Sequence, residues 1–231
     1  MSAPMQRIGL IGGISWAATA DYYRYINLDV RQRLGGHHSA DMVIRSLDLH
    51  PLLQQANDID AVEQVMRAAS DDLQAASASL IAIASFTGHR YAGALKNGAL
   101  PFVDLTEAIG AAVREAGYER IGVWATSYAL QDSTLMSQLS SASGAQLISP
   151  PRELHAELDR IVFSEIAAGA LTTAATQTLQ RLLLQQVEQG AQALLLATTD
   201  FSPLLGVLES PVPMLDGSLI HCRAIVDAAL A

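Results

Sequence analysis

Short apolar runs alternate along the chain with longer stretches in which apolar residues recur at helical spacing. This alternation predicts parallel strands joined by crossover helices, and therefore the α/β class. The expected strands are Ile8–Ile11, Met42–Ser46, Leu80–Ala84, Ile121–Ala125, Gln146–Ile148 and Ala193–Ala197. The expected helices are Trp16–Arg33, Ile59–Ser77, Thr106–Ala116, Arg152–Ala168 and Thr173–Gln189.

Two segments more than a hundred residues apart have the same pattern. Residues 78–85 and residues 190–198 each read as a small-residue turn, a buried strand and then a polar cluster. The similarity indicates two related halves, each with polar side chains at the carboxyl edge of a sheet, where open α/β sheets bind ligands. The alternative is that any two buried strands look alike.

A glycine turn follows the first expected strand. In Gly9–Trp16, Gly12 and Gly13 precede Ser15, which is a plausible helix cap. Backbone N–H groups at the start of a helix bind anions readily, so these residues are candidates for holding a substrate. The spacing is not that of a dinucleotide fingerprint, and a tight turn that requires glycine is the competing interpretation.

Two polar clusters follow buried strands and could carry chemistry. Ser85, Thr87 and His89 offer two hydroxyls and an imidazole, as a general acid/base site needs. The competing interpretation is a solvated loop with Thr87 as the cap of the next helix.

The second cluster offers two hydroxyls and a carboxylate, from Thr198, Thr199 and Asp200. Here Asp200 or Ser202 could instead cap a short helix that begins at Pro203. The matching places of the two clusters in the two halves favour a shared function.

Composition and charge exclude several classes of protein. The 231 residues hold 14 Lys and Arg against 23 Asp and Glu, a net charge of −9, so no general field attracts nucleic acid or an anionic membrane. The apolar stretch that begins at Ile8 is too short for a signal peptide or a membrane span.

Cys222 is the sole cysteine, so no internal disulfide forms and a cytoplasmic location is the simplest expectation. No spacing of Cys and His predicts a metal site, and His155 is expected on a helix surface.

Four segments resemble the aspartate/glutamate racemase superfamily, and specifically its broad amino-acid racemase branch. They are Ile8–Trp16 with Tyr22, Tyr23, Ile26 and Asn27 after it, then Ser85–His89, Ala197–Asp200 and Pro211–Asp216. Weaker similarity at 34–40 and 120–123 extends the resemblance over more than nine-tenths of the chain.

The resemblance implies two Rossmann-like, three-layer α/β domains with parallel sheets, related by a pseudo-two-fold axis. It places residues 1–102 and 210–231 in the first domain and 103–209 in the second, with the active site in the cleft between them. Such proteins are commonly homodimers and work without pyridoxal phosphate, metal or nucleotide. One cysteine removes the α-proton, and another returns a proton on the opposite face.

This chain departs from that pattern at the positions that matter most. Ser85 and Thr198 stand where the two cysteines are expected, Phe86 replaces an asparagine that helps to hold the substrate carboxylate, and Asp200 replaces a glutamate. The pKa of an unassisted aliphatic hydroxyl lies far above the ~8.5 of a free thiol, so neither replacement can act as the base near neutral pH. The sequence therefore excludes two-thiol racemisation.

Two functions remain open. The first is an enzyme that acts at the α-carbon of an amino acid or related carboxylic acid with altered bases, in isomerisation, epimerisation or lyase-type chemistry. Its candidate bases are His89 and Asp200, and its candidate hydrogen-bond donors are Ser85, Thr87, Thr198 and Thr199. The second is an inactive homologue that binds a carboxylate as a sensor or regulatory protein.

The resemblance also predicts which residues line the cleft. They are Gly12, Gly13, Ser15, Ser85, Phe86, Thr87, Thr198, Thr199 and Asp200. Phe86 would make the pocket narrower and more apolar, which argues against plain aspartate as the substrate. Arg45, at the end of the second expected strand, is the candidate positive charge for a substrate carboxylate, with an ordinary exposed arginine as the alternative.

Overall fold

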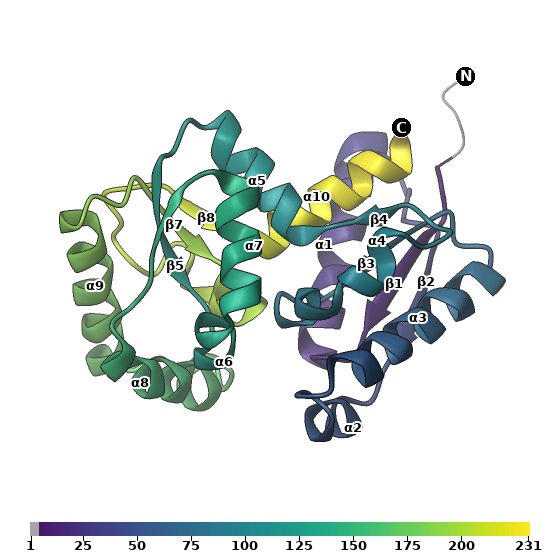
Figure 1. Ribbon diagram of the computed structural model, residues 1–231. Coiled ribbons are helices and arrows are strands. Elements are labelled where there is room, and N and C mark those ends of the chain that lie inside the picture. Colours follow the sequence, from purple (N-terminus) through teal and green to yellow (C-terminus); the bar gives the residue numbers. More distant parts are fainter. Residues whose placement is uncertain (1–4) are drawn as a thin grey trace. The chain divides into compact units, whose positions relative to one another are not determined.

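The computed structural model describes residues 5–231 as an α/β protein whose chain divides into two compact units (Figure 1). Unit 1 holds the described residues up to Ala108 together with Leu219–Ala231, and unit 2 holds Ile109–Ser218. The boundary at Ala108 falls within helix α5, Leu105–Glu115.

Unit 1 is built on a four-stranded parallel sheet. Its strands are β1 (Ile8–Gly12), β2 (Met42–Ser46), β3 (Leu80–Ile83) and β4 (Phe102–Val103), in the order β2-β1-β3-β4. The register pairs Ile8 of β1 with Met42 on one side and with Leu80 on the other. Strands β1 and β3 are buried along their whole length, as expected for the centre of a parallel sheet.

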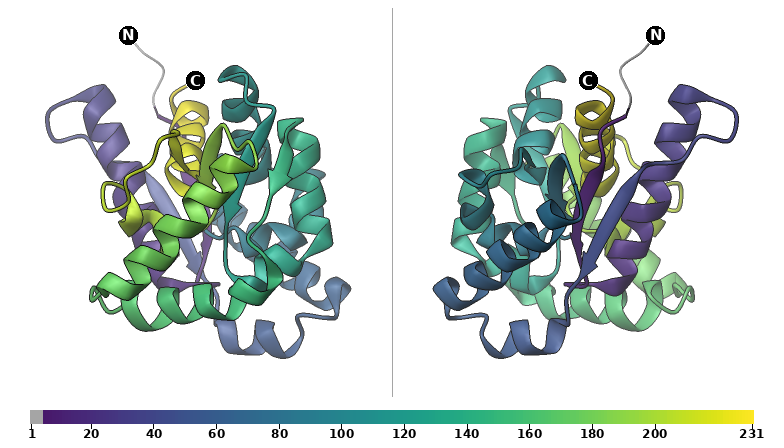
Figure 2. Two further views of the ribbon diagram at one scale, coloured as in Figure 1. Left: turned by 90° about the vertical axis from the view of Figure 1, so that its left-hand side faces the viewer. Right: turned by 90° about the vertical axis from the view of Figure 1, so that its right-hand side faces the viewer.

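Helices cover both faces of this sheet because side chains alternate along the strands. Leu80 and Ala82 of β3 pack in one apolar cluster with helices α1 (Trp16–Leu34) and α10 (Gly217–Leu230). Ile81 and Ile83 point the other way and pack with α3 (Ile59–Ala75) and α4 (Gly93–Lys96). The right-hand view of Figure 2 shows the strands of unit 1 between α1 and α3. The remaining elements are α2 (Leu49–Gln54) and the 3-10 helix η1 (Thr87–Tyr91).

Unit 2 repeats the same topology. Its strands are β5 (Arg120–Trp124), β6 (Gln146–Ile148), β7 (Ala193–Leu196) and β8 (Met214–Asp216), all parallel and in the order β6-β5-β7-β8. The helical segments are α6 (Ser127–Gln131), α7 (Ser133–Ser143), η2 (Arg152–Leu154), α8 (His155–Arg160), η3 (Ile161–Ile166), α9 (Thr173–Glu188) and η4 (Thr199–Leu204). Leucines of α9 pack on Leu194 and Leu196 of β7, and α9 covers that face of the sheet in the left-hand view of Figure 2.

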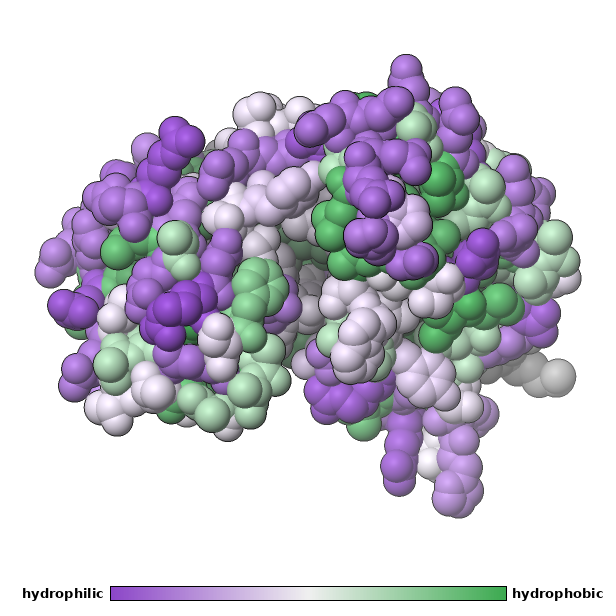
Figure 3. Space-filling model, turned by 90° about the horizontal axis from the view of Figure 1, so that it is seen from below, coloured by the Kyte–Doolittle hydropathy of each residue, from purple (hydrophilic) through white to green (hydrophobic). Residues whose placement is uncertain are grey.

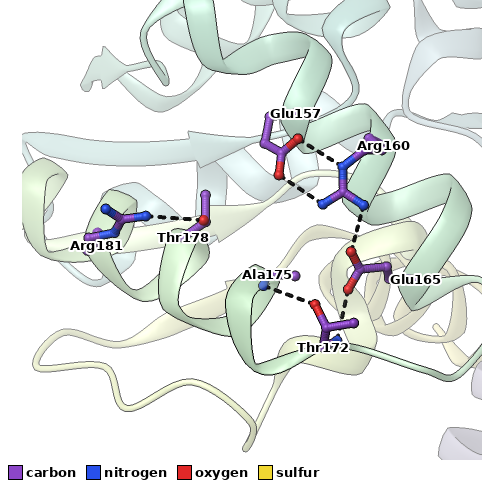
Figure 4. Close-up of polar contacts among 7 residues, drawn as sticks. All are labelled: Glu157, Arg160, Glu165, Thr172, Ala175, Thr178 and Arg181. Carbon is purple, nitrogen blue, oxygen red and sulfur yellow. Dashed lines mark hydrogen bonds and ion pairs between the residues drawn. The ribbon is translucent and has the colours of Figure 1, made fainter.

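The single helix expected over Arg152–Ala168 is a continuous helical stretch over residues 152–166, in which the hydrogen bonding changes from 3-10 to α to π. Arg160 at the end of α8 donates to Glu157 and to Glu165, and Glu165 accepts from the backbone N–H of Thr172 (Figure 4). Residues Ile161–Ile166 between these partners form a π-helix. Because Thr172 is also the N-cap of α9, the network ties the end of α8 to the start of α9.

The structure confirms the α/β class and all six predicted strands, and it corrects other details. It adds β4 and β8, which are two and three residues long, and helix α7, which the sequence analysis did not predict. Gly117 and Gly190 end the helices before them in left-handed backbone conformation. Strand β4 pairs with β3 and strand β8 pairs with β7, and the two compact units place residues 103–108 in unit 1 and residues 210–218 in unit 2.

None of the helices within residues 5–231 combines the length and the apolar character needed to cross a membrane. On the face of the molecule in Figure 3, hydrophilic and apolar side chains are interspersed over both units. The largest exposed aromatic side chain is Trp16 at the start of α1.

Candidate functional site

Each sheet has a switch point, where the crossovers from two neighbouring central strands leave toward opposite faces. In unit 1 this point lies between β1 and β3. The chain leaves β1 into α1 on one face of the sheet, and it leaves β3 toward α4 on the other face. In unit 2 the same strand order puts it between β5 and β7. Ligands in open α/β sheets bind outside the carboxyl ends of such strands, so the candidate site residues are those that directly follow them.

The glycine turn after β1 is shaped by close backbone approach. Gly13 has a φ of 86°, and a Cβ built on it would lie 2.0 Å from the carbonyl oxygen of Leu47. A Cβ on Gly12 would collide with Thr19, whose Oγ1 accepts from the N–H of Gly13 at 2.9 Å. Ser15 caps α1 as predicted, because its Oγ accepts from Ala18 N–H at 3.2 Å. The amide of Gly13 and the acceptor site of Ser15 are therefore already used within the protein.

The Ser85 cluster after β3 is compact and internally hydrogen-bonded. The hydroxyls of Ser85 and Thr87 lie 3.0 Å apart, and Ser85 Oγ accepts from the N–H of Gly88 at 3.1 Å. Ser85 and Phe86 are buried, while Thr87 is half-buried. Phe86 precedes the first residue of η1, so Thr87 is not its cap. Among residues 5–231, the hydrogen-bond partners of the Ser85 hydroxyl are the Thr87 hydroxyl and the Gly88 N–H, and neither group activates it as a nucleophile or a base.

His89 is fixed by two backbone groups and is not placed as a general base. Its Nε2 accepts from the N–H of Leu105 at 3.0 Å, which requires the proton to be on Nδ1. Nδ1 then donates to the carbonyl oxygen of Ser85 at 2.7 Å. The ring is 0% exposed, and burial lowers the pKa of His89, although Asp104 and the Ser85 carbonyl oppose this shift. Both ring nitrogens are therefore engaged by backbone groups of the protein.

Arg45 forms an ion pair within its own unit. Its side chain is exposed, and its Nε donates to Asp72 at 2.8 Å while Nη1 donates to the carbonyl of Ser46. The guanidinium is paired with a carboxylate of its own unit, and a role of Arg45 in ligand binding stays a prediction. The alternative of an ordinary exposed arginine describes the structure.

The Thr198 cluster in unit 2 is organised differently from the Ser85 cluster. Thr198 is buried, and its Oγ1 has no hydrogen-bond partner among residues 5–231; the same holds for the buried Oγ of Ser202. Thr199 and Asp200 are half-buried on the first turn of η4. Because η4 begins at Thr199, neither Asp200 nor Ser202 caps a helix starting at Pro203. Ser85 and Thr198 belong to different units, so their meeting in one site stays a prediction.

Two residues at the end of β5 were missed by the sequence analysis. Thr126 and Ser127 follow β5, the strand next to β7, so they lie at the same sheet edge as Thr198. Asp159 of α8 holds this turn, because its carboxylate accepts from Ser127 N–H at 2.9 Å and from Ser127 Oγ at 2.5 Å. The signal in the sequence was a third polar pair directly after a buried strand.

Two further side chains complete the description. His155 is buried rather than on a helix surface, with Nε2 bonded to the carbonyl of Pro150 and Nδ1 unpartnered within the described chain. Cys222 is buried in the core of unit 1 beside Tyr22 and Ile225. Among residues 5–231, no group of three His, Cys, Asp or Glu side chains could hold a metal ion.

Comparison with known proteins finds similarity to racemases over nearly the whole chain. A family model described as Asp/Glu/Hydantoin racemase matches residues 11–225. A provisionally assigned Asp/Glu racemase from Yersinia pestis is 29% identical, with a TM-score of 0.91 over 98% of this chain and 100% of that one.

More distant structures share the fold. An aspartate racemase homologue from Pyrococcus horikoshii OT3 is 22% identical, with a TM-score of 0.85 over 97% of this chain and 99% of that one. A glutamate racemase from Francisella tularensis, solved in complex with D-glutamate, is 15% identical, with a TM-score of 0.64 over 97% of this chain and 81% of that one.

Proposed function

Because the chain belongs to the Asp/Glu/hydantoin racemase family, we propose that it is an isomerase-type enzyme acting at the α-carbon of an amino acid or related carboxylic acid. The proposal concerns a reaction whose bases differ from a pair of thiols. Fold alone does not fix a reaction, so the chemistry is argued from the groups at the two sheet edges.

A two-thiol mechanism is incompatible with this chain. Its single cysteine, Cys222, is 1% exposed and packs in an apolar core. Burial in apolar surroundings disfavours the thiolate, and one thiol cannot serve both faces of an α-carbon.

The observation that carries the proposal is the buried hydroxyl of Thr198. An unpartnered hydroxyl in the interior costs about 1–3 kcal/mol, and a ligand oxygen that accepts its proton would remove that cost. The Thr198 Oγ1 lies at the same sheet edge as Thr126, so this edge offers hydroxyl donors to a carboxylate or to an enolate oxygen.

The reaction also needs a group that removes the α-proton. Of the four predicted catalytic residues, Ser85 and Thr198 do not ionise near neutral pH, and both ring nitrogens of His89 contact backbone groups. Asp200 remains, half-buried on η4 two residues after Thr198. We propose that Asp200 removes the α-proton and that the resulting carbanion either takes up a proton at another position, which is isomerisation, or expels a substituent from the β-carbon, which is elimination, because a single base serves only one face of the α-carbon.

We also propose that the Ser85 and Thr198 edges act on one substrate. The support is that both clusters follow the third strand of sheets with identical order. A double-mutant cycle of Ser85→Ala and Thr198→Val, read by substrate turnover, tests this. Coupling well above 0.5 kcal/mol supports a shared substrate, and strict additivity contradicts it.

The activity is tested by proton exchange. Candidate amino and dicarboxylic acids are incubated with the protein in deuterated water, and loss of the α-proton signal is followed by NMR. We expect exchange with the natural chain, and a loss of at least 100-fold in Asp200→Asn with binding retained. Asp60→Asn, an exposed carboxylate on α3, serves as the matched control.

A binding protein without turnover is the second candidate function. It is favoured by one specific observation, namely that the Ser85 hydroxyl has no base as a hydrogen-bond partner within residues 5–231. Saturable binding of a carboxylic acid without α-proton exchange would select this function and overturn the enzymatic one.

Two further proposals concern the setting of the protein. A cytoplasmic location is supported by the low cysteine content. A homodimer is supported by helix α1, where Trp16, Tyr23 and Leu34 are exposed at spacings that place them on one face of the helix. Light scattering of Tyr23→Glu tests the second proposal, since a charge in the interface should give monomers.

A further inference from the structure

His89 lies in a buried cluster that joins four elements of unit 1. Its Nδ1 contacts the Ser85 carbonyl oxygen at 2.7 Å, and its Nε2 accepts from Leu105 N–H at 3.0 Å. The ring packs against Phe102 of β4 and stands edge-on to His221 of α10, with centroids 5.4 Å apart. His89 therefore links the end of β3 to the first residue of α5.

The second histidine has the opposite tautomer. His221 Nε2 lies 2.9 Å from the carbonyl oxygen of Val103, which can only accept, so Nε2 carries the proton. Its Nδ1 then accepts from the hydroxyl of Tyr22 on α1 at 2.9 Å. Only Asp104 separates Val103 from Leu105, so the two histidines form hydrogen bonds to the same short segment of backbone.

We infer that His89 is a positioning residue for Ser85: it anchors the Ser85 carbonyl to the start of α5, and His221 with Tyr22 buttresses that anchor. The orientation of Ser85 Oγ toward Thr87 Oγ1 and Gly88 N–H follows from this anchor. The inference deepens the proposed function, because it assigns His89 to the placement of the serine and not to proton transfer.

The anchor works only with both imidazoles neutral. A proton on His89 Nε2 would face the N–H of Leu105, turning a hydrogen bond into a donor–donor contact. The ionisable and charged groups around the cluster are His221 on α10, Tyr22 on α1, Lys96 on α4 and Asp104 before α5, and the last two form an ion pair at 2.8 Å. Burial lowers the pKa of His89 by more than Asp104 and the Ser85 carbonyl raise it, and Lys96 lowers it further, so the neutral imidazole is favoured.

Two substitutions separate the two contacts of His89. Asparagine can place a side-chain N–H near the position of Nδ1 and so retain the donor to Ser85, while glutamine can place an oxygen near Nε2 and so retain the acceptor for Leu105. We expect the amide of Gly88, which reports the Ser85 hydroxyl, to exchange at least tenfold faster in His89→Gln than in His89→Asn. His50→Gln, at an exposed position on helix α2, is the matched control and should leave the exchange rate of the Gly88 amide unchanged.

Nitrogen NMR of the unmodified protein provides a second test that does not depend on variant folding. We expect the Nδ1–H tautomer for His89, the Nε2–H tautomer for His221, and no titration of His89 between pH 8 and pH 6. An Nε2–H tautomer, an ordinary titration of His89, or equal Gly88 exchange in both variants would overturn the inference.

Turnover then separates this inference from the proposed function. With α-proton exchange present, His89→Asn should retain more of kcat than His89→Gln at similar KM, whereas loss of a base would abolish kcat in both. If no substrate shows exchange while the tautomers and the Gly88 amide behave as expected, the proposed function fails and the anchor stands.

Discussion

The carboxyl edges of the two sheets have the same strand order but differ in the hydrogen bonding of the polar clusters that follow β3 and β7. At the edge of unit 1, the Ser85 hydroxyl, the Gly88 amide, the Ser85 carbonyl and the Gly13 amide all have partners within the protein. At the edge of unit 2, the hydroxyls of Thr198 and Ser202 are buried without a partner among residues 5–231. The strand order is β2-β1-β3-β4 in one unit and β6-β5-β7-β8 in the other.

The difference shows that a repeated fold does not imply a repeated chemical role. An edge whose polar groups bond to one another is stable without a ligand and offers a rigid surface. An edge with unpartnered buried hydroxyls is less stable by itself and gains more from binding a polar ligand. On the proposed function, we therefore expect a substrate oxygen to be recognised mainly at the edge of unit 2.

The largest expected effect is the response of the edge of unit 1 to acid. Burial lowers the pKa of His89, and burial together with the neighbouring His89 lowers that of His221 to about 3. Since each folded-state pKa lies below the unfolded value of about 6.5, the unfolded chain binds these protons first, and stability is lost as pH falls below about 6.5.

For His221 alone the loss on approaching pH 3 is on the order of 4 kcal/mol. Chemical denaturation between pH 7 and pH 4 should show this decline, and amides of Gly88 and Leu105 should lose protection before that of Ser127. Replacing the exposed His38 by Gln should leave the curve unchanged. A free energy of unfolding that stays flat from pH 6.5 to pH 4 contradicts the neutral histidine pair.

The second prediction concerns the glycine turn of the same edge. Gly13→Ala should lower the free energy of unfolding by about 3 kcal/mol or more, because its φ is 86° and the new Cβ would meet the backbone of Leu47. Gly36→Ala is the control, since Gly36 also has a positive φ but has nothing within 4 Å of the added Cβ, and it should cost about 1 kcal/mol. Equal costs would mean that close packing does not shape this turn.

The third prediction tests how the edge of unit 2 is held. Asp159→Ala removes two hydrogen bonds to Ser127, one from its N–H and one from its hydroxyl. We expect a loss of about 2 kcal/mol in the free energy of unfolding, and weaker substrate binding if Thr126 contacts the ligand. Glu153→Ala, an exposed acidic residue on η2, should have little effect by comparison.

The pattern of apolar residues predicted the central strands because a short, uninterrupted apolar run between turn residues is typical of a strand that is buried on both faces of a sheet. It did not predict β4 and β8, which have only two or three residues and follow Pro101 and Pro213. The change from α-helical to π-helical hydrogen bonding after Arg160 was also not predicted, because it coincides with an ion-pair network among Glu157, Arg160 and Glu165 and not with glycine or proline.

The sequence indicated candidate site residues, but their hydrogen-bond partners could be predicted only in part. Ser85 and Thr198 were chosen because polar residues directly follow buried strands, and the structure places both residues at the ends of such strands. The role of His89 depends on a backbone N–H 16 residues away, and the role of Asp159 depends on a turn 32 residues away. Such long-range hydrogen bonds leave no local pattern in the chain.

The smallest expected effect is also the most direct test of the difference between the two edges. It is the change in the free energy of unfolding, without ligand, for Ser85→Ala compared with Thr198→Val. Ser85→Ala leaves the Gly88 N–H without its acceptor and should destabilise the protein by about 1–2 kcal/mol, whereas Thr198→Val removes an unpartnered hydroxyl and should be neutral or stabilising by about 1 kcal/mol. A loss of stability in Thr198→Val as large as that in Ser85→Ala would contradict the account.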